Sequence, residues 1–480
     1  MSQTLAQAPV PAPPRESLPR GPEVLGHPRG LLFLAGTELW DRVSFHGMQA
    51  LLTLYMVEQL LLPGHIEHVA GFGVFRAALE SMTGPLSSQA LAFQIFGIYI
   101  GLVNMTPLLG GLLGDRLLGR RRTVTLGALL MTAGHFCMAF DESFLLALLL
   151  LTVGAGCLRA NLVAQVGTLY APEDRRRADA FQIYYSCVNA GAFIAPLISG
   201  ALGKAYGWHY GFGFAGFGML AGLLIYLRGQ RYLPPEPVRT AARVRTRLTS
   251  AEWRVVVVLG ALMPVLATFW VAQSQVWNVY NVWVRDHVDL QVAGWTMPVP
   301  WLQSLDGLAP LLTMPLVVLW WRRQAVRGRE PDDFRKLALG CLFFGLATAW
   351  LAAGHLVAGV DHRIPLAWAI AFHLASNVGW LFFTPTAMAL FVRTAPASVN
   401  AQMIGVYCLS IFSGSIASGR LGVLYERLEP QAFWLLHAAI VGGGGLLLLL
   451  LARWLRGELV PRGPFAGFTT RATPASLQRG

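Results

Sequence analysis

Apolar runs long enough to cross a membrane recur along the whole chain, separated by short polar segments. Representative runs are AFQIFGIYIGLVNMTPLLGGLLG (92–114), SFLLALLLLTVGAGCLRANLVAQVGTLY (143–170) and AFWLLHAAIVGGGGLLLLLLARWL (432–455). A helix needs roughly 20 apolar residues to span the hydrocarbon, and the pattern predicts about twelve such spans. A membrane barrel would instead show short strands of alternating apolar and polar residues. The chain is therefore predicted to be an all-α membrane protein.

The predicted spans fall into two groups of six, at residues 31–227 and 254–455. A basic linker, residues 228–253, lies between them and holds no further apolar run. Residues 1–30 are Pro-rich without an apolar signal region, which predicts a disordered cytoplasmic tail. Residues 456–480 are expected to form a second cytoplasmic tail. Two six-helix bundles joined in this way match the major facilitator plan.

Composition and charge distribution support the membrane interpretation. Of the 480 residues 55% are hydrophobic and 13% are charged, whereas soluble proteins carry about 25% charged residues. The formal charge of +12 is concentrated in every second loop, as in GDRLLGRRRT (114–123) and WRRQAVRGREPDDFRK (321–336). This alternation predicts that both termini are cytoplasmic. We expect a multi-pass protein of a bacterial inner membrane, with the lipid bilayer and not nucleic acid as its partner.

Three charged residues interrupt the first predicted span. The segment ELWDRVSFHGMQALLTLY (38–55) contains Glu38, Asp41 and Arg42. At about 100° per residue these three share one helix face with Phe45, and the opposite face is apolar. Glu38 and Arg42 are four residues apart and are therefore placed to neutralise one another. Ionisable groups at membrane depth mark transport pathways, so we expect this face to line a cavity; a purely structural ion pair is the alternative.

Other predicted spans also carry polar side chains, and no enzymatic motif competes with transport. The polar residues are Arg159, Tyr184, Tyr185, Asn189, Ser274, Gln275, Asn278, Asp306 and Asn377. His46 borders the face of Glu38 and Arg42, and a free imidazole titrates near neutral pH. The chain lacks a GxxxxGK[ST] loop, an HExxH motif and a CxxC pair. We therefore expect a secondary transporter without catalytic residues, metal or other cofactor.

Several segments resemble signatures of the proton-dependent oligopeptide transporters. ELWDRVSFHGMQALLTLYM (38–56) is similar to that family's ExxERFxYYGMRALLxLYM motif. GCLRANLVAQVGTLY (156–170) resembles its GxLKPNxxxxxGxLY stretch, and DAFQIYYSCVNAGAFIAPLISG (179–200) its fifth-helix signature FxIYYxxINxGxxxAPLxxG. The resemblance implies a monomeric symporter that couples protons to the movement of peptides or peptide-like solutes by alternating access.

The resemblance also implies roles for individual residues. Glu38, Asp41 and Arg42 correspond to the motif that takes part in proton coupling and substrate binding. Arg159 replaces the family's fourth-helix lysine, and with Arg42 it would form a positive site for the substrate carboxylate. The remaining substrate-binding candidates, from the spans and the resemblance together, are Phe45, His46, Tyr184, Tyr185, Asn189, Ser274, Gln275, Asn278, Asn377 and Trp380.

Two departures from the family pattern keep other functions open. Ser274 stands where the family has a glutamate in helix 7, and Trp380 where a helix-10 glutamate receives the free amine of the peptide. An aromatic face holds a cation by only about 0.5–2 kcal/mol, so specificity for a free amine should fall. An alternative is therefore a transporter, or exporter, of a non-peptide anionic or aromatic metabolite with altered or absent proton coupling. A further alternative is a receptor or scaffold that transports nothing.

Overall fold

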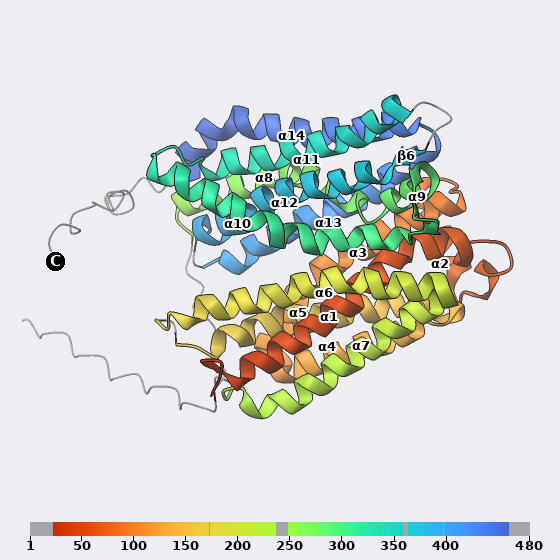
Figure 1. Ribbon diagram of the computed structural model, residues 1–480. Coiled ribbons are helices and arrows are strands. Elements are labelled where there is room, and N and C mark those ends of the chain that lie inside the picture. The colour runs from red at the N-terminus through yellow and green to blue at the C-terminus, as the bar shows by residue number, and fades with distance from the viewer. Residues whose placement is uncertain (1–22, 172, 237–247, 359–362, 397, 460–480) are drawn as a thin grey trace, which may run out of the picture.

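The computed structural model describes residues 23–171, 173–236, 248–358, 363–396 and 398–459. Its long helices form two groups, one above the other in Figure 1. The N-terminal half comprises α1 (Arg29–Tyr55), α2 (Phe72–Thr83), α3 (Ser88–Leu113), α4 (Arg120–Cys137), α5 (Phe144–Thr168), α6 (Arg176–Tyr206) and α7 (Trp208–Gly229). The C-terminal half comprises α8 (Ser250–Gln275), α9 (Val279–His287), α10 (Leu305–Val326), α11 (Asp333–Ala358), α12 (Leu366–Thr394), α13 (Asn400–Gly422) and α14 (Pro430–Leu459).

Short elements connect or extend these helices. The short helices are η1 (Met56–Leu60), η2 (Ile66–His68), η3 (Gly114–Leu118), η4 (Asp141–Ser143), η5 (Gln230–Tyr232), η6 (Val299–Ser304) and η7 (Val423–Glu426). The two-residue strands are β1 (Glu23–Val24), β2 (His27–Pro28), β3 (Val288–Asp289), β4 (Gln291–Val292), β5 (Trp295–Thr296) and β6 (Ile364–Pro365). Antiparallel pairing joins β1 to β2 and β4 to β5, and parallel pairing joins β3 to β6.

Ten of the described helical segments are long and apolar enough to cross a membrane, judged by length and composition. The two other long helices are α1 and α4. Glu38, Asp41 and Arg42 lower the hydropathy of α1, and three arginines open α4. Both nevertheless pack against neighbouring helices, α1 on α6 and α7, and α4 on α5 and α7. The prediction of an all-helical protein with two six-helix bundles is confirmed.

The two halves meet along two seams, α3 against α13 and α6 against α10. Glycines allow backbone-to-backbone contact there: a Cβ on Gly97 of α3 would lie 2.6 Å from the Ser415 carbonyl oxygen and 2.9 Å from Gly419 Cα. A Cβ on Gly307 of α10 would lie 2.4 Å from the Phe193 nitrogen of α6. Small residues permit this close approach where the hydrophobic effect does not hold helices together.

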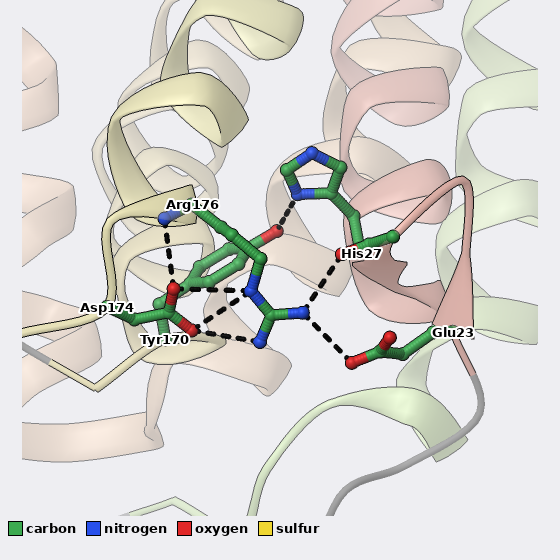
Figure 2. A network of polar contacts seen from close by, with 6 residues as sticks. Glu23, His27, Tyr170, Asp174 and Arg176 are labelled. Atoms are coloured by element: carbon green, nitrogen blue, oxygen red, sulfur yellow. Dashed lines mark hydrogen bonds and ion pairs between the residues drawn. The ribbon is translucent and has the colours of Figure 1, made fainter.

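A hairpin precedes α1 and is fastened to the segment between α5 and α6 (Figure 2). Arg176 donates from Nη1 to Glu23 Oε1 at 3.0 Å and to the Gly26 carbonyl at 2.9 Å, and from Nη2 to Asp174 Oδ2 at 2.9 Å. His27 Nδ1 lies 2.8 Å from the Tyr170 hydroxyl. Burial raises the pKa of Tyr170 to about 12, so this hydroxyl is neutral at physiological pH.

Residues 23–30, which the sequence pattern assigned to the disordered tail, thus form a hairpin and the first turn of α1. The reason is a tight turn at Leu25 and Gly26, both with positive φ, which matches the twist of paired strands. Residues 1–22 of the expected tail lie outside the described residues, as do 237–247 of the expected linker and 460–480 at the other end. Residues 456–459 continue α14.

Helix α1 begins and α14 ends at the same end of the molecule, on the left in Figure 1. Polar contacts between the halves occur at the opposite end. Arg285 Nη1 lies 3.2 Å from Glu58 Oε1, and the Lys204 ammonium donates to the Thr296 carbonyl. The Ser87 hydroxyl, at the start of α3, donates to Glu426 Oε1 at 2.6 Å. These contacts hold the halves together at the end away from the termini.

Candidate functional site

The charged residues of α1 form an ion-pair network in the middle of the helix. Arg42 Nε donates to Glu38 Oε1 at 2.7 Å, and Arg42 Nη2 lies 2.9 Å from Asp41 Oδ2. The Tyr184 hydroxyl of α6 donates to the second oxygen of Glu38. The Asp41 side chain is fully buried and that of Glu38 is 3% exposed. Bare charges at this depth would be unstable, so the mutual neutralisation offsets the cost of burying these side chains in α1.

Arg159 of α5 completes what we call the arginine cluster: Glu38, Asp41, Arg42, Arg159 and Tyr184. Its Nε lies 3.5 Å from Asp41 Oδ2, and its guanidinium carbon lies 4.1 Å from the centre of the Phe45 ring. Stacking on an aromatic face is a favoured arrangement for arginine. The buried Nε and Nη2 atoms of Arg159 make no hydrogen bond within the described part of the chain. Because Nε faces Asp41, Nη2 is the buried, charged donor of Arg159 that is available to an anion in the described chain.

The α6 candidates face different surroundings. Tyr184 is fully buried at Glu38, whereas Tyr185 is 54% exposed and its ring lies edge-on to that of Tyr184. The Asn189 amide donates to the Tyr185 carbonyl of its own helix at 3.1 Å. The backbone oxygen of Asn189 lies where α6 meets Gly307 of α10. Asn189 is therefore at the seam between the halves, one turn beyond the tyrosines.

A break between α8 and α9 places two residues at the contact with the N-terminal half. The Trp277 ring lies 5.3 Å from that of His46, and the Asn278 amide donates to the Phe93 carbonyl at 3.1 Å. Gln303 Nε2 donates to the Val276 carbonyl, which the break has freed, at 2.6 Å. Irregular backbone inside a membrane protein is tolerated where side chains satisfy it in this way. Sequence reasoning did not identify Trp277, because the apolar run continues through the break without a proline.

Ser274 and Gln275 are bonded within the C-terminal half. The Ser274 hydroxyl lies 3.0 Å from that of Ser415. Gln275 Nε2 donates to the Ser418 carbonyl at 2.9 Å and lies 3.0 Å from His437 Nε2. Both side chains are therefore engaged between helices and, in this conformation, do not reach the arginine cluster.

A second polar group joins α10 to α12, and we call Asp306, His373 and Asn377 the Asp–His cluster. His373 Nδ1 donates to Asp306 Oδ1 at 2.8 Å, and Asn377 Nδ2 donates to the same oxygen at 2.9 Å. Trp380 lies one turn beyond Asn377 on α12 and is partly buried among apolar side chains. The polar character of Asp306 and Asn377 is visible in the sequence, but their pairing with His373 is not.

No group of three or more His, Cys, Asp or Glu side chains in the described ranges is arranged to hold a metal ion. An open hollow of about 610 Å³ lies between α1 and α6 and is lined by Leu39, Gln182, Ser186 and Cys187 among others. The charged side chains of the arginine cluster do not line it. They lie deeper, where α1, α5 and α6 meet.

Comparison with known families and structures gives a consistent picture. The model of the POT family matches residues 121–247 and 235–435 of the chain. The peptide transporter YePEPT of Yersinia enterocolitica subsp. palearctica is 27% identical over 475 residues, which cover 84% of this chain and 89% of that protein. A di-/tripeptide transporter of Lactococcus lactis subsp. cremoris is 26% identical over 482 residues, covering 86% and 93%.

A solved structure is similar over most of the chain. It is the crystal structure of a peptide transporter POT, in a mutant form and in complex with alafosfalin. The TM-score is 0.80 and the identity 25%, with 92% of this chain and 97% of that chain covered. This similarity supports the fold predicted from the hydropathy pattern, including its division into two helical bundles.

Proposed function

The chain belongs to the POT family, and from that membership we propose that it is a secondary active transporter that moves peptides or peptide-like solutes by alternating access. We further propose protons as the coupled ion, a monomer as the working unit, and transport rather than a catalytic reaction as its activity. Its similarity to a peptide transporter of Yersinia and a di-/tripeptide transporter of Lactococcus supports peptides as the substrate class.

One observation carries the substrate site: Arg159 has buried donors without a hydrogen-bond partner in the described chain. A guanidinium group binds a carboxylate through two parallel hydrogen bonds, and a peptide ends in a carboxylate. Arg42 lies on the other side of Asp41, so a carboxylate that enters the cluster meets two arginines. Phe45 holds Arg159 in place from the opposite face. We therefore assign substrate-carboxylate binding to Arg42 and Arg159.

Proton coupling follows from the position of Asp41 between the two arginines. Its oxygen Oδ2 faces both, at 2.9 Å from Arg42 and 3.5 Å from Arg159. A proton on Asp41 or Glu38 removes a negative charge from the network and frees an arginine to change partner. The freed guanidinium then binds the substrate carboxylate, so proton and substrate stabilise the same loaded state. Rearrangement of the halves around this central site is the alternating-access step.

The test combines binding and transport. Dialanine and alafosfalin are screened for thermal stabilisation of the purified protein, and uptake is measured in vesicles with an imposed inward proton gradient. The proposal expects stabilisation by at least one of these compounds and faster uptake with the gradient. Arg159→Ala and Arg42→Ala should abolish the stabilisation, whereas Arg254→Ala, at the start of α8 and paired with Glu458, should keep it. Uptake that ignores the gradient contradicts the coupling, and unchanged affinity in both arginine variants contradicts the assigned site.

A second candidate is a non-peptide anion, and one feature favours it. Ser274 and the Gln275 amide nitrogen are bonded to Ser415, Ser418 and His437, so in the described part of α8 the segment that replaces the family's glutamate offers a substrate amine no carboxylate, only the uncharged Gln275 Oε1. An anion without an amine would need only the arginine cluster. The same thermal screen distinguishes the candidates: stabilisation by N-acetylated dialanine equal to that by dialanine favours the anion, and a strict need for the free amine favours the peptide.

We also propose that both termini are cytoplasmic, in a bacterial inner membrane. Arg120, Arg121 and Arg122 begin α4, Arg175 and Arg176 precede or begin α6, and these basic segments lie between helices at the end where α1 begins. Cytoplasmic loops carry the excess of arginine and lysine. Reaction of a single cysteine introduced next to Arg329, measured with a membrane-impermeant reagent in intact and in lysed cells, tests this orientation.

A further inference from the structure

The Asp–His cluster has no role in the site described so far, although it places an ionisable pair inside the C-terminal half. Asp306 Oδ1 receives hydrogen bonds from His373 Nδ1 at 2.8 Å and from Asn377 Nδ2 at 2.9 Å. The His373 side chain is fully buried, and that of Asp306 is 14% exposed. Two helices, α10 and α12, therefore hold one carboxylate in a fixed orientation.

The depth of the pair distinguishes it from the other acids of this half. Asp306 and His373 each lie roughly 10 Å along a helical span at 1.5 Å per residue, the spans being Val299–Val326 and Leu366–Thr394. The other acids in the described C-terminal spans are near span ends: Glu252, Asp286, Asp333, Glu426 and Glu458. Ionisable residues within a span mark proton or substrate pathways.

The hydrogen bonding specifies where a proton fits. His373 Nδ1–H donates to Asp306, and the buried Nε2 atom meets no donor or acceptor in the described chain. A neutral imidazole suits this arrangement, because a second N–H on Nε2 would be buried without an acceptor. Asp306 Oδ2 accepts no hydrogen bond from the described residues, since both donors use Oδ1. An arriving proton therefore forms an O–H bond at Oδ2, and the pair changes from one negative charge to neutral.

Few other polar groups influence the protonation of Asp306 and His373. Tyr280 of α9 lies edge-on to His373, with ring centres 5.1 Å apart, and a phenol is neutral at physiological pH. On α6, the backbone oxygen of Asn189 lies at the contact with Gly307, and the Asn189 side chain is uncharged. Within the described residues of α6, α11, α13 and η6, no charged side chain makes a hydrogen bond or ion pair with Asp306 or His373. Protonation of Asp306 and His373 is therefore not opposed by an ion pair to another charged side chain in the described chain.

The neighbouring residue connects the pair to the other half. Gly307 follows Asp306 directly and packs on the backbone of α6 at Ala192 and Phe193. A change of charge and hydrogen bonding at Asp306 thus occurs one residue from a seam about which the halves must move. Asp306 therefore stands next to a contact between the halves.

We propose that Asp306 and His373 together bind one transported proton, as a protonation site of the C-terminal half that is separate from the arginine cluster. The proposal rests on the proton-coupled transport proposed above and adds a second site to it. The two residues act together because His373 Nδ1 and Asp306 Oδ1 share one hydrogen bond at 2.8 Å. The site acts on protons only and needs no contact with the substrate.

The first experiment requires no substrate. Infrared difference spectra of the purified protein are recorded between pH about 5 and about 8, the range in which an imidazole-linked group titrates. We expect a carboxylic-acid band in the wild type that Asp306→Asn removes and that Asp289→Asn, at an exposed position in the same half, leaves in place. His373→Gln keeps a side-chain donor for Asp306 and is expected to shift the midpoint of the band by about one pH unit or more. His437→Gln, a buried imidazole bonded to Gln275 and not to a carboxylate, should leave the midpoint unchanged.

The second experiment counts protons in vesicles with dialanine as the probe. Asp306→Asn is expected to retain exchange of dialanine at equal concentrations and to lose one proton per dialanine in gradient-driven uptake. The double variant Asp306→Asn/His373→Gln should show the same loss as Asp306→Asn alone. An unchanged infrared spectrum or unchanged proton count in Asp306→Asn overturns the proposal while leaving gradient-driven uptake in place. Uptake that ignores the gradient in the wild type contradicts the proposed function itself, and this inference with it.

Discussion

The arginine cluster and the Asp–His cluster lie in opposite halves and balance buried carboxylates by different means. Glu38 and Asp41 face the guanidinium groups of Arg42 and Arg159. Asp306 instead receives its hydrogen bonds from an imidazole and an amide. An arginine keeps its charge at every physiological pH, whereas the imidazole and the amide that face Asp306 supply hydrogen bonds and no fixed charge. The first cluster is therefore balanced by fixed charges, and the balance of the second depends on a proton.

This difference suggests a division of tasks between the halves. Fixed positive charges suit the binding of a permanent anion such as a peptide carboxylate, because the guanidinium groups themselves stay charged at every physiological pH. A titratable pair is unsuited to that task and suited to following the proton gradient. In our proposals the N-terminal half recognises substrate and senses protons through Glu38 and Asp41, while the C-terminal half contributes a proton site alone. Variants that exchange or remove the residues facing these carboxylates test whether the two clusters differ in this way.

The largest effect is expected from Arg42→Met, which leaves Glu38 without its cation. Removal of one partner of a buried ion pair lowers the free energy of unfolding by about 3–5 kcal/mol. Denaturation of the purified protein in detergent measures the change. The double variant Glu38→Gln/Arg42→Met should recover part of the loss, because Asp41 still faces Arg159 at 3.5 Å. A double variant as unstable as the single one contradicts balance by fixed charge.

A smaller effect is expected from Asn377→Ala in the Asp–His cluster. It removes one of the two donors to Asp306, and a hydrogen bond to a charged group contributes about 1.5–3 kcal/mol. The matched control is Asn104→Ala, whose amide bonds to the Ile100 carbonyl of its own helix at 2.9 Å. We expect the control to lose less than about 1 kcal/mol. Equal losses in both variants would show that Asn377 supports its helix rather than the Asp306 carboxylate.

Phe45→Leu tests whether the aromatic face under Arg159 adds to the fixed-charge cluster. The guanidinium carbon lies 4.1 Å from the ring centre, and such a cation–π contact contributes about 0.5–2 kcal/mol. A double-mutant cycle with Arg159→Met isolates this energy from the loss of ring packing. The free energy of unfolding of the two single variants and the double variant is the measurement. Additive effects of the two substitutions would exclude a stabilising contact.

The smallest effect is expected outside both clusters, at Asp174 in the network of Figure 2. Hydrogen bonds from Arg176 lower the pKa of Asp174. A carboxylate with a lowered pKa stabilises the fold above its unfolded pKa of about 4 and loses this effect as the pH falls further. The protection of residues 23–28 against hydrogen exchange, relative to the intrinsic rate at each pH, should therefore stay high from neutral pH down to about 4 and fall below it. In Asp174→Asn the exchange should be faster at neutral pH as well, with dialanine uptake unchanged.

The fold was predictable because the feature that specifies it, the succession of apolar runs, is local in the sequence. Apolar runs give the spans, whereas the orientation drawn from the basic loops stays a prediction. The shared face of Glu38, Asp41 and Arg42 follows from helical periodicity, and the structure indeed pairs these residues. Features set by a local turn without an apolar signal, such as the hairpin at Leu25 and Gly26, were missed because the surrounding prolines are typical of disorder.

The partners of the site residues were harder to predict than the residues themselves. Arg159 stacks on Phe45 and His46 contacts Trp277, and each contact joins residues more than a hundred positions apart. The pairing of Asp306 with His373 likewise joins two different helices, at positions 67 apart in the sequence. Sequence periodicity specifies which face of a helix is polar, but which helix covers that face depends on packing across the whole bundle.

The glycine seam between α3 and α13 has a consequence for trapping this transporter. At Gly97 and Gly419 main chain touches main chain, so no side chain has to leave one pocket and enter another when the halves tilt. An added side chain would clash with the opposite main chain in this conformation. It would therefore favour a conformation in which the two helices lie further apart at this point. Alanine at either glycine should then slow the cycle without touching substrate or proton groups, which makes this seam a place to arrest the molecule in a single state.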